Sequence, residues 1–395
     1  MNAVGDDVEV VPFRIVDDES FAVPADALVD PIEGPVYPTP AGSKIPVPRL
    51  ARHEITLDDG HVVGVAVSGR GVPLVVVHGF TAEGFLYAQS LSRLVSMGFK
   101  VIAIDTAGHG GTQGLPAGGG SFEAYTKVLS RAVDELGIKR AMFAGHSMGG
   151  RLITQLAASE PERAIAVLCI DAIVGETWDR RVNAMRLFPP AAGLVGIAMA
   201  VDGLLTVPVF GDRTQAAKLL RLVTPTLLGH ARRPWRLMGP GVSIIRSRGS
   251  RWMLQRIAQE NVPFFALHGD RDVTVPLKTA IDAARRARGT LVTVHGGSHS
   301  WVLRDPETLP GIIGELLTGP LGEAYRAAVR DAGLDPDAAS VDDLEAAFYD
   351  EEALVLELTP AVEFSDTATR RRAPRYVWTV ADHRSHLDAD RPSSS

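Results

Sequence analysis

Residues 143–150 have the sequence FAGHSMGG, in which an apolar segment leads into one serine, Ser147, set between glycines. The apolar residues predict a strand that ends at Ala144, and the residues from Met148 onward predict a helix. Glycines permit the tight turn that lifts a serine above a sheet, and the helix N-terminus favours a developing negative charge. A serine hydroxyl is a weak nucleophile, so chemistry at Ser147 requires a base, an acid that orients the base, and donors for an oxyanion.

The segments on both sides of this turn alternate between short apolar runs and helical periods. Residues 73–80, 100–108, 140–147 and 164–172 are almost continuously apolar, which is typical of strands buried on both faces. Helical spacing follows Ser121, which is placed to cap a helix over 122–136. Residues 51–68 predict a β-hairpin that turns at Asp59 and Gly60. We therefore predict an α/β fold with a mostly parallel central sheet and helices on both faces.

The alternation defines the predicted domain organisation. It spans 51–175, stops over 176–257, and resumes over 258–320, so 176–257 is predicted to be a helical cap inserted into the core. Residues 1–50 are rich in proline and predict an extended arm, and 321–395 predict a helical extension that ends in a disordered tail. The apolar residues of the first cap helices are expected to face the sheet: Leu194, Val195, Ile197, Met199, Leu204 and Leu205.

Composition excludes several functional classes. The net charge of −7 gives no reason to expect nucleic acid as a partner. Cys169 is the one cysteine, so neither an intramolecular disulfide nor a cysteine cluster for a metal can form. The N-terminal residues lack the pattern of a secretory signal, and the longest apolar stretch, 189–210, is interrupted by Asp202 and Pro208. We expect a cytoplasmic protein without a transmembrane segment.

Two further strand ends supply candidates for the base and the acid. His299 lies in a Gly/Ser loop after the apolar run 290–295, and Asp272 follows the apolar run that ends near Gly269. The chain order serine, aspartate, histidine is the order expected of this architecture. The sequence also offers rival acids: Asp171 at an earlier strand end, Glu176 after it, and Asp270. Asp272 is favoured because Gly269 and Asp272 have a G-x-x-D spacing that resembles that of a known family, with Pro276 following to start a helix.

These motifs resemble those of the α/β-hydrolase superfamily of serine hydrolases, over roughly residues 55–320. The resemblance implies a Ser147, Asp272 and His299 triad with an oxyanion hole made by the backbone N–H groups of Phe80 and Met148. It also implies that the segment DTAGHGGT at 105–112 has a structural role. The residues expected to line the substrate pocket are His78, Gly79 and Trp301. No metal or organic cofactor is implied.

The resemblance narrows the reaction without fixing the substrate. Haloalkane dehalogenases and epoxide hydrolases carry Asp where this chain has Ser147, so hydrolysis of a small carboxylic ester or lactone is the favoured activity. The alternatives are an acyltransferase that uses the same acyl-enzyme, a C–C bond hydrolase, and a non-catalytic binding protein of this fold.

Two features lie outside the motifs. The segment 231–252 carries an arginine cluster beside two tryptophans, which is either a solvated basic face or a surface for an anionic substrate or lipid. Its members are Arg232, Arg233, Arg236, Arg246, Arg248, Arg251, Trp235 and Trp252. The strand-like segments 8–16 and 375–380 are expected to dock on the core or on a second subunit, which suggests a homodimer.

Overall fold

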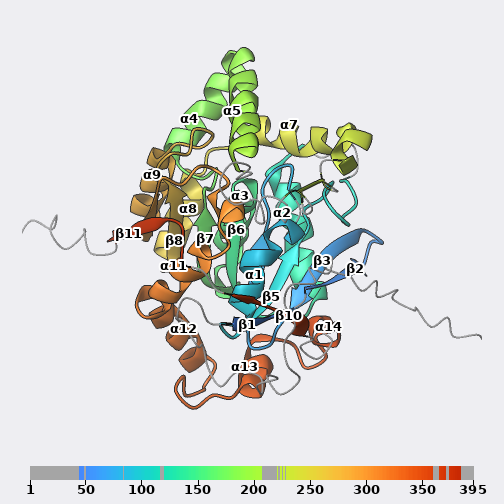
Figure 1. Cartoon of the computed structure of the whole chain (residues 1–395), viewed down its shortest axis with the longest axis vertical. Coiled ribbons are helices and arrows are strands. Elements are labelled where there is room, and N and C mark those ends of the chain that lie inside the picture. Colours follow the sequence, from blue (N-terminus) through green and yellow to red (C-terminus); the bar gives the residue numbers. More distant parts are fainter. Residues whose placement is uncertain are drawn as a thin grey trace, which may run out of the picture.

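The computed structural model describes these residues: 44–48, 50–82, 84–115, 120–206, 220, 223–224, 226, 228–358, 364–370 and 373–383. Its centre is a nine-stranded sheet in the order β11-β9-β8-β7-β6-β4-β5-β3-β2 (Figure 1). The strands are β2 (Ala51–Thr56), β3 (Val62–Ser68), β4 (Val72–Val77), β5 (Phe99–Ile104), β6 (Ala141–His146), β7 (Ala164–Ile170), β8 (Phe264–Gly269), β9 (Thr290–His295) and β11 (Val377–Asp382). Neighbours from β9 to β5 pair in parallel, and β2, β3 and β11 pair antiparallel at the edges. The predicted fold class is confirmed.

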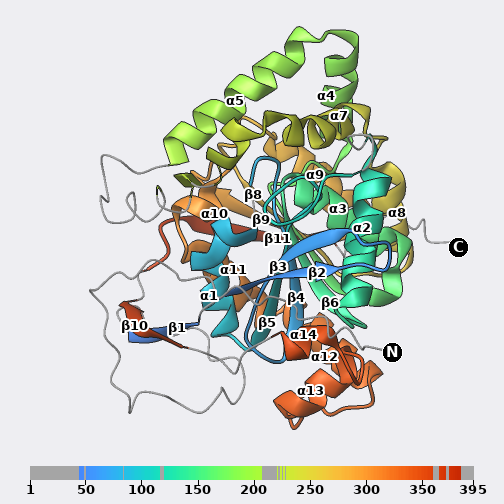
Figure 2. The ribbon, with the colours of Figure 1, turned by 90° about the vertical axis from the view of Figure 1, so that its right-hand side faces the viewer.

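Helices cover both faces of the sheet (Figure 2). On one face lie α2 (Phe122–Glu135), α3 (Met148–Ser159), α8 (Arg251–Gln259) and α9 (Leu277–Ala287). On the other face lie α1 (Ala88–Val95) and α11 (Thr308–Leu317). Every residue of strands β4 to β8 is buried, which explains why these strands are almost entirely apolar rather than alternating.

Two local features that the sequence predicts, a hairpin and a helix cap, are present in the structure. Strands β2 and β3 form the predicted hairpin, in which Gly60 takes a φ of +80° and the Asp59 carboxylate accepts from the N–H of His61. The hydroxyl of Ser121 accepts from the N–H of Ala124 and caps α2 as predicted.

The inserted segment forms a layer beyond the carboxyl ends of the strands (Figure 1). It contains α4 (Glu176–Leu187), α5 (Pro190–Thr206), η5 (Pro234–Leu237) and α7 (Met238–Arg246), whereas α8 packs between α3 and α9 against the sheet. The expectation that its apolar residues face the sheet is wrong for two of them, because Leu194 and Ile197 are 67% and 62% exposed. They share one face of α5 with Val201, whereas the next residue, Asp202, lies about 100° further round the helix and is buried.

The other predicted apolar cap residues differ in burial. Val195 and Met199 are half-buried, and the side chains of Leu204 and Leu205 lie outside the described ones. A helix that is apolar on all sides carries no periodicity to show which face it buries, so the orientation of α5 could not be read from its residues.

The C-terminal part of the chain folds against the body of the protein. Helices α12 (Pro320–Asp331), α13 (Val341–Phe348) and α14 (Leu354–Glu357) lie at the end of the molecule opposite α5 (Figure 1). Phe348, Tyr349 and Val355 are fully buried there, and Tyr349 forms a β-bridge to Ile138. Strand β11 extends the main sheet, so the predicted segment at 375–380 docks on the core.

Five short elements complete the structure. Strands β1 (Lys44–Pro48) and β10 (Phe364–Arg370) form a separate antiparallel pair. Two short helices are η2 (Gly84–Tyr87) and η4 (Pro161–Arg163), and α10 (Trp301–Arg304) follows the loop of His299. The strand predicted at 8–16 and the predicted disordered tail lie outside the described residues. Among the described helices, none combines the length and apolar character that crossing a bilayer requires.

Trp378 should anchor β11 to the core. Its indole N–H donates to Glu315 at 2.7 Å, and the ring occupies the space that a side chain at Gly311 would fill. Trp378→Ala should lower the free energy of unfolding by about 2 kcal/mol, since a half-buried aromatic ring is removed. The neighbouring Val377 is 72% exposed, so Val377→Ala is the matched control and should change stability by less than about 0.5 kcal/mol in urea unfolding. Equal effects of the two substitutions would contradict this role.

Candidate active site

Ser147 occupies a strained turn between β6 and α3. Its φ of +52° and ψ of −114° lie outside the regions that non-glycine residues normally adopt. Such a conformation persists only where its surroundings enforce it. Here they do, because α3 approaches the strands at backbone distance: a Cβ atom at Gly149 would lie 2.1 Å from the carbonyl oxygen of Val77, and one at Gly145 would lie 2.5 Å from the carbonyl carbon of Gly149.

The three predicted residues form one hydrogen-bonded row. Nε2 of His299 lies 3.0 Å from Oγ of Ser147, and Nδ1 lies 2.7 Å from Oδ2 of Asp272. All three are buried, with exposures of 5–7%. A hydroxyl, an imidazole and a carboxylate in this arrangement can transfer the serine proton to the imidazole while the carboxylate stabilises the resulting charge.

Asp272 is held by its own loop. Its Oδ1 accepts from the N–H groups of Thr274 and Val275, at 2.8 and 2.7 Å, which leaves Oδ2 for His299. Burial alone would raise the pKa of Asp272, but the facing imidazole of His299 and that of His268 outweigh it, and the pKa falls well below its usual range. Asp272 is therefore an ionised acceptor.

The pKa of His299 is shifted in the opposite direction from that of Asp272. Burial alone would lower its pKa, but the Asp272 carboxylate, with smaller contributions from two other acids, raises it to about 9. Those two acids are Asp171 and Asp202.

The rival acids lie elsewhere. Asp270 binds the N–H of Gly296 and the ring of His295, and Glu176 is paired with Arg180 on α4. Asp171 accepts from the N–H of Gly269 at 2.9 Å, and its Oδ2 is buried without a hydrogen-bond partner among the described residues. The structure thus brings Asp272, and none of its rivals, into hydrogen-bonding contact with His299.

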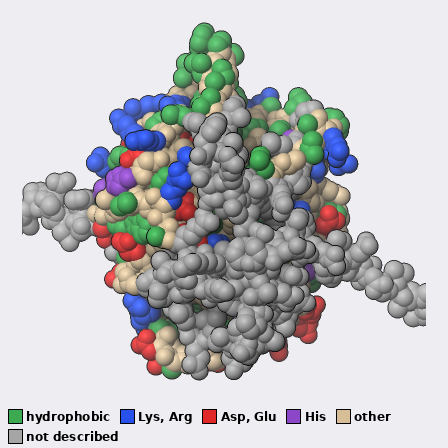
Figure 3. All heavy atoms as spheres, viewed as in Figure 1, with side chains coloured by type: hydrophobic (Ala, Val, Ile, Leu, Met, Phe, Trp, Pro, Cys, Tyr) green, Lys and Arg blue, Asp and Glu red, His purple; other side chains and the backbone are tan. Residues whose placement is uncertain are grey.

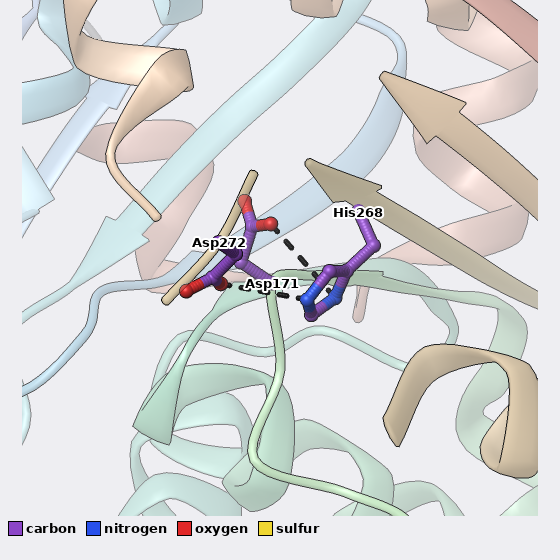
Figure 4. A group of neighbouring side chains, drawn as sticks. All are labelled: Asp171, His268 and Asp272. Atoms are coloured by element: carbon purple, nitrogen blue, oxygen red, sulfur yellow. Dashed lines mark ion pairs between the residues drawn. The ribbon is translucent and has the colours of Figure 1, made fainter. Parts of the chain in front are cut away.

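A second imidazole lies behind the first. Figure 4 shows the ring of His268, from the end of β8, facing the carboxylates of Asp171 and Asp272. Its Nδ1 lies 3.8 Å from Oδ1 of Asp171, and its Nε2 lies 3.4 Å from Oδ2 of Asp272. Burial alone would lower the pKa of His268, but Asp171 and Asp272 outweigh it and raise the pKa. The pKa of Asp171 is itself raised to about 7, chiefly by burial.

The same three residues have ligand atoms within 4.8 Å of one another, a spacing that a metal ion could use. Both oxygens of Asp272 and Nε2 of His268 are already committed, however, although Oδ2 of Asp171 is not. Nε2 of His268 donates to the carbonyl of Val275, and both oxygens of Asp272 accept hydrogen bonds. We therefore interpret the group as an electrostatic support for Asp272.

The predicted oxyanion donors flank Ser147. A Cβ atom at Gly79 would lie 3.2 Å from Cβ of Ser147, which brings the next residue, Phe80, beside the serine. Within the described chain, the N–H groups of Phe80 and Met148 donate to no other backbone group. The first N–H groups of a helix have no intrahelical partner, so that of Met148 is free by construction.

The other predicted pocket residues lie behind the site. His78 is fully buried, with Nδ1 donating to the carbonyl of Gly79 and Nε2 accepting from the N–H of Thr106. Trp301 is also fully buried, at the start of α10. Of the three residues predicted for the pocket, His78 and Trp301 are thus fully buried, and Gly79 is the one that lies against Ser147.

Sequence reasoning missed a relay that holds the loop of His299. Nε2 of His146 donates to the carbonyl of His299 at 2.8 Å, so its Nδ1 accepts from the hydroxyl of Tyr87 at 2.9 Å. Burial lowers the pKa of His146 to about 3, which keeps this ring neutral and its tautomer fixed. The position of His146 next to Ser147 in the sequence could have indicated a role in the site. Nothing in the sequence around Tyr87 indicated one.

Residues of the cap contact two loops at the candidate site. Nε2 of His230 lies 3.1 Å from the carbonyl of Thr81, in the loop after β4, and the carbonyl of Arg236 closes against Gly108. The segment 105–112 is structural as predicted: Asp105 accepts from the N–H groups of Gly84 and Gly111.

Comparison with known proteins places the chain. Residues 72–307 match the family model described as serine aminopeptidase, S33, which covers more than half of the chain. The chain belongs to this family. Among curated relatives of this S33 protein, a putative non-heme haloperoxidase of Mycobacterium phage D29 is 33% identical over 267 residues, covering 66% of this chain and 94% of the relative. A pimeloyl-[acyl-carrier protein] methyl ester esterase of Aliivibrio fischeri is 25% identical over 219 residues, covering 54% and 80%.

Solved structures agree on the fold. A thermophilic esterase from Thermogutta terrifontis superposes with a TM-score of 0.53 at 20% identity, covering 68% of this chain and 98% of that one. The epoxide hydrolase of Vigna radiata gives a TM-score of 0.54 at 19% identity, covering 68% and 98%. These likenesses establish that the S33 protein has the α/β-hydrolase fold.

Proposed function

We propose that the protein hydrolyses a carboxylic ester or lactone through an acyl-enzyme on Ser147. The observation that carries this proposal is the continuous row from Ser147 through His299 to Asp272, with heavy-atom distances of 3.0 and 2.7 Å. The esterases among its relatives and structural neighbours support the choice of an acyl substrate. Ser147 stands where the epoxide hydrolases of this superfamily carry an aspartate, which favours an acyl-enzyme over an alkyl-enzyme.

The proposed reaction has two halves. Neutral His299 accepts the proton of Ser147 as Oγ attacks the carbonyl carbon, and the N–H groups of Phe80 and Met148 bind the oxyanion. Protonated His299 then gives this proton to the departing alkoxide, which leaves as the alcohol and yields the acyl-enzyme. In the second half His299 accepts a proton from the water that attacks the acyl carbon. Protonated His299 then returns this proton to Oγ of Ser147 as the C–O bond to the serine breaks, which releases the acid and restores free Ser147 and neutral His299.

A fluorophosphonate probe tests the first half directly. It should label the wild-type protein and leave Ser147→Ala unlabelled, and the substitution should lower ester turnover by several orders of magnitude. A panel of p-nitrophenyl esters and lactones identifies the acyl group. Added alcohols separate hydrolysis from acyl transfer, since a transferase would form a new ester. Labelling that survives in Ser147→Ala would contradict the proposal.

The orienting carboxylate can be assigned by two substitutions. Asp272→Asn should fold, bind substrate and lose about 10⁴-fold in kcat, because the amide neither fixes the tautomer of His299 nor stabilises its charge. Asp171→Asn should retain most of its activity, since Asp171 has no hydrogen bond to His299 and accepts from Gly269 instead. If Asp171→Asn were the inactive variant, the acid would have to be reassigned.

The pH profile should rise toward alkaline values. His299 must be neutral to accept the serine proton, and its pKa of about 9 in the free protein means that kcat/KM should fall about tenfold per pH unit below that value. Asp202→Asn removes one of the carboxylates that raise this pKa, so the profile should move to lower pH. Asp270→Asn is the control, because Asp270 interacts with His295 rather than His299. A profile that Asp202→Asn leaves in place would refute this coupling.

A further inference from the structure

Exposed apolar side chains are concentrated at one end of the molecule. Ten large hydrophobic residues between 187 and 242 are at least 39% exposed, and the rest of the described chain contributes four more. The side chains with the largest exposed fractions are those of Leu187 at 87%, Leu194 and Met238 at 67%, and Ile197 and Trp235 at 62%. We call the following residues the apolar crest: Leu187, Phe188, Leu194, Ile197, Val201, Trp235, Met238 and Val242.

The crest lies on the outer side of the cap. Figure 3 shows hydrophobic side chains clustered over the projecting end formed by α4 and α5, and more of them toward α7, with Lys and Arg side chains beside both groups. Monomers rarely leave extensive apolar surface in water without a partner to cover it.

The charge of this segment opposes that of the rest of the protein. The whole chain carries a net charge of −7, yet residues 186–251 hold ten basic residues and two acidic ones. One of the two acids, Asp202, is buried on the inner face of α5. Arg232, Arg233 and Arg246 are exposed and form no ion pair with the described residues. No acid among the described residues neutralises these three charges, which could therefore bind an external anion.

We propose that the apolar crest and its arginines dock on the surface of an anionic phospholipid bilayer. The aliphatic and aromatic side chains would enter the boundary between headgroups and acyl chains, and the arginines would bind the phosphates above them. Trp235 suits this boundary, because its ring is apolar and its indole N–H is a hydrogen-bond donor.

A second copy of the chain fits the same surface less well. A two-fold symmetric contact places identical patches together, so the basic surface of one copy would meet the equally basic surface of the other. A bilayer with anionic headgroups offers the opposite charge over the whole contact. Its lipids can also adapt to an uneven apolar surface, so no shape complementarity is required. Charge complementarity therefore favours lipid.

The docking surface is connected to the loops of the candidate site. His230 lies two residues before Arg232, and its ring contacts the carbonyl of Thr81 in the loop that presents Phe80. Gly241 on α7 lies against the ring of Phe80, where a Cβ atom at Gly241 would be 3.7 Å from Cζ of the ring. Docking through the crest would hold this side of the cap at the lipid surface, with the loop of Phe80 directly beneath it.

Vesicle flotation of the full chain tests the proposal without measuring turnover, so its outcome does not depend on ester hydrolysis. The wild type should float with phosphatidylcholine vesicles that contain phosphatidylserine, float weakly with phosphatidylcholine alone, and dissociate at high salt. Leu194→Asn combined with Ile197→Asn should lower the partition coefficient about tenfold or more. Arg232→Gln combined with Arg233→Gln should lower it about 25-fold, at about fivefold per arginine.

The matched controls are exposed residues far from the cap. Val377→Asn controls for loss of an exposed apolar side chain, and Lys139→Gln combined with Arg330→Gln controls for loss of two charges; both should bind like the wild type. Circular dichroism melting confirms that every variant is folded. The proposal is overturned if the wild type does not float with anionic vesicles or if the crest variants float as well as the controls. It is also overturned if sedimentation shows a dimer that the Leu194 and Ile197 substitutions dissociate.

Discussion

The backbone-to-backbone contact between α3 and β4 determines the arrangement around Ser147. Gly149 lies so close to the carbonyl oxygens of Val77 and His78 that no side chain fits between them. This contact fixes the first turn of α3, and the turn in its position forces Ser147 into its strained conformation. The same contact brings the loop after β4 beside the serine, so the nucleophile and the proposed oxyanion donors are placed by one packing constraint.

Charge is arranged around this turn in layers. Next to Ser147 lies His299, whose ring faces Asp272, and behind that carboxylate lies His268 with Asp171. Acids and imidazoles alternate in a buried region, so each charge is stabilised by the next. Removing any one of them changes the pKa values of its neighbours.

The central sheet, the hairpin, the cap of α2 and the row of Ser147, Asp272 and His299 were predictable, since each leaves a local mark. Apolar runs mark buried strands, and small or polar residues mark the strand ends where side chains converge. The relay from Tyr87 through His146 was not predictable, because it joins residues that only the tertiary fold brings together. The exposure of Leu194 and Ile197 on α5 was not predictable, because the composition of α5 is that of a buried helix. Which side of such a helix is covered depends only on the positions of the neighbouring elements.

Strand β11 also bears on how the chain reaches this fold. It covers the free edge of β9, where Val377 pairs with His295 from a segment far earlier in the chain. During synthesis β9 is made first, and its N–H and C=O groups remain an open template until β11 arrives. A nascent chain paused in this interval exposes a strand edge that invites pairing with other chains. Until β11 is made, the edge of β9 is therefore the part of the sheet most open to pairing with another chain.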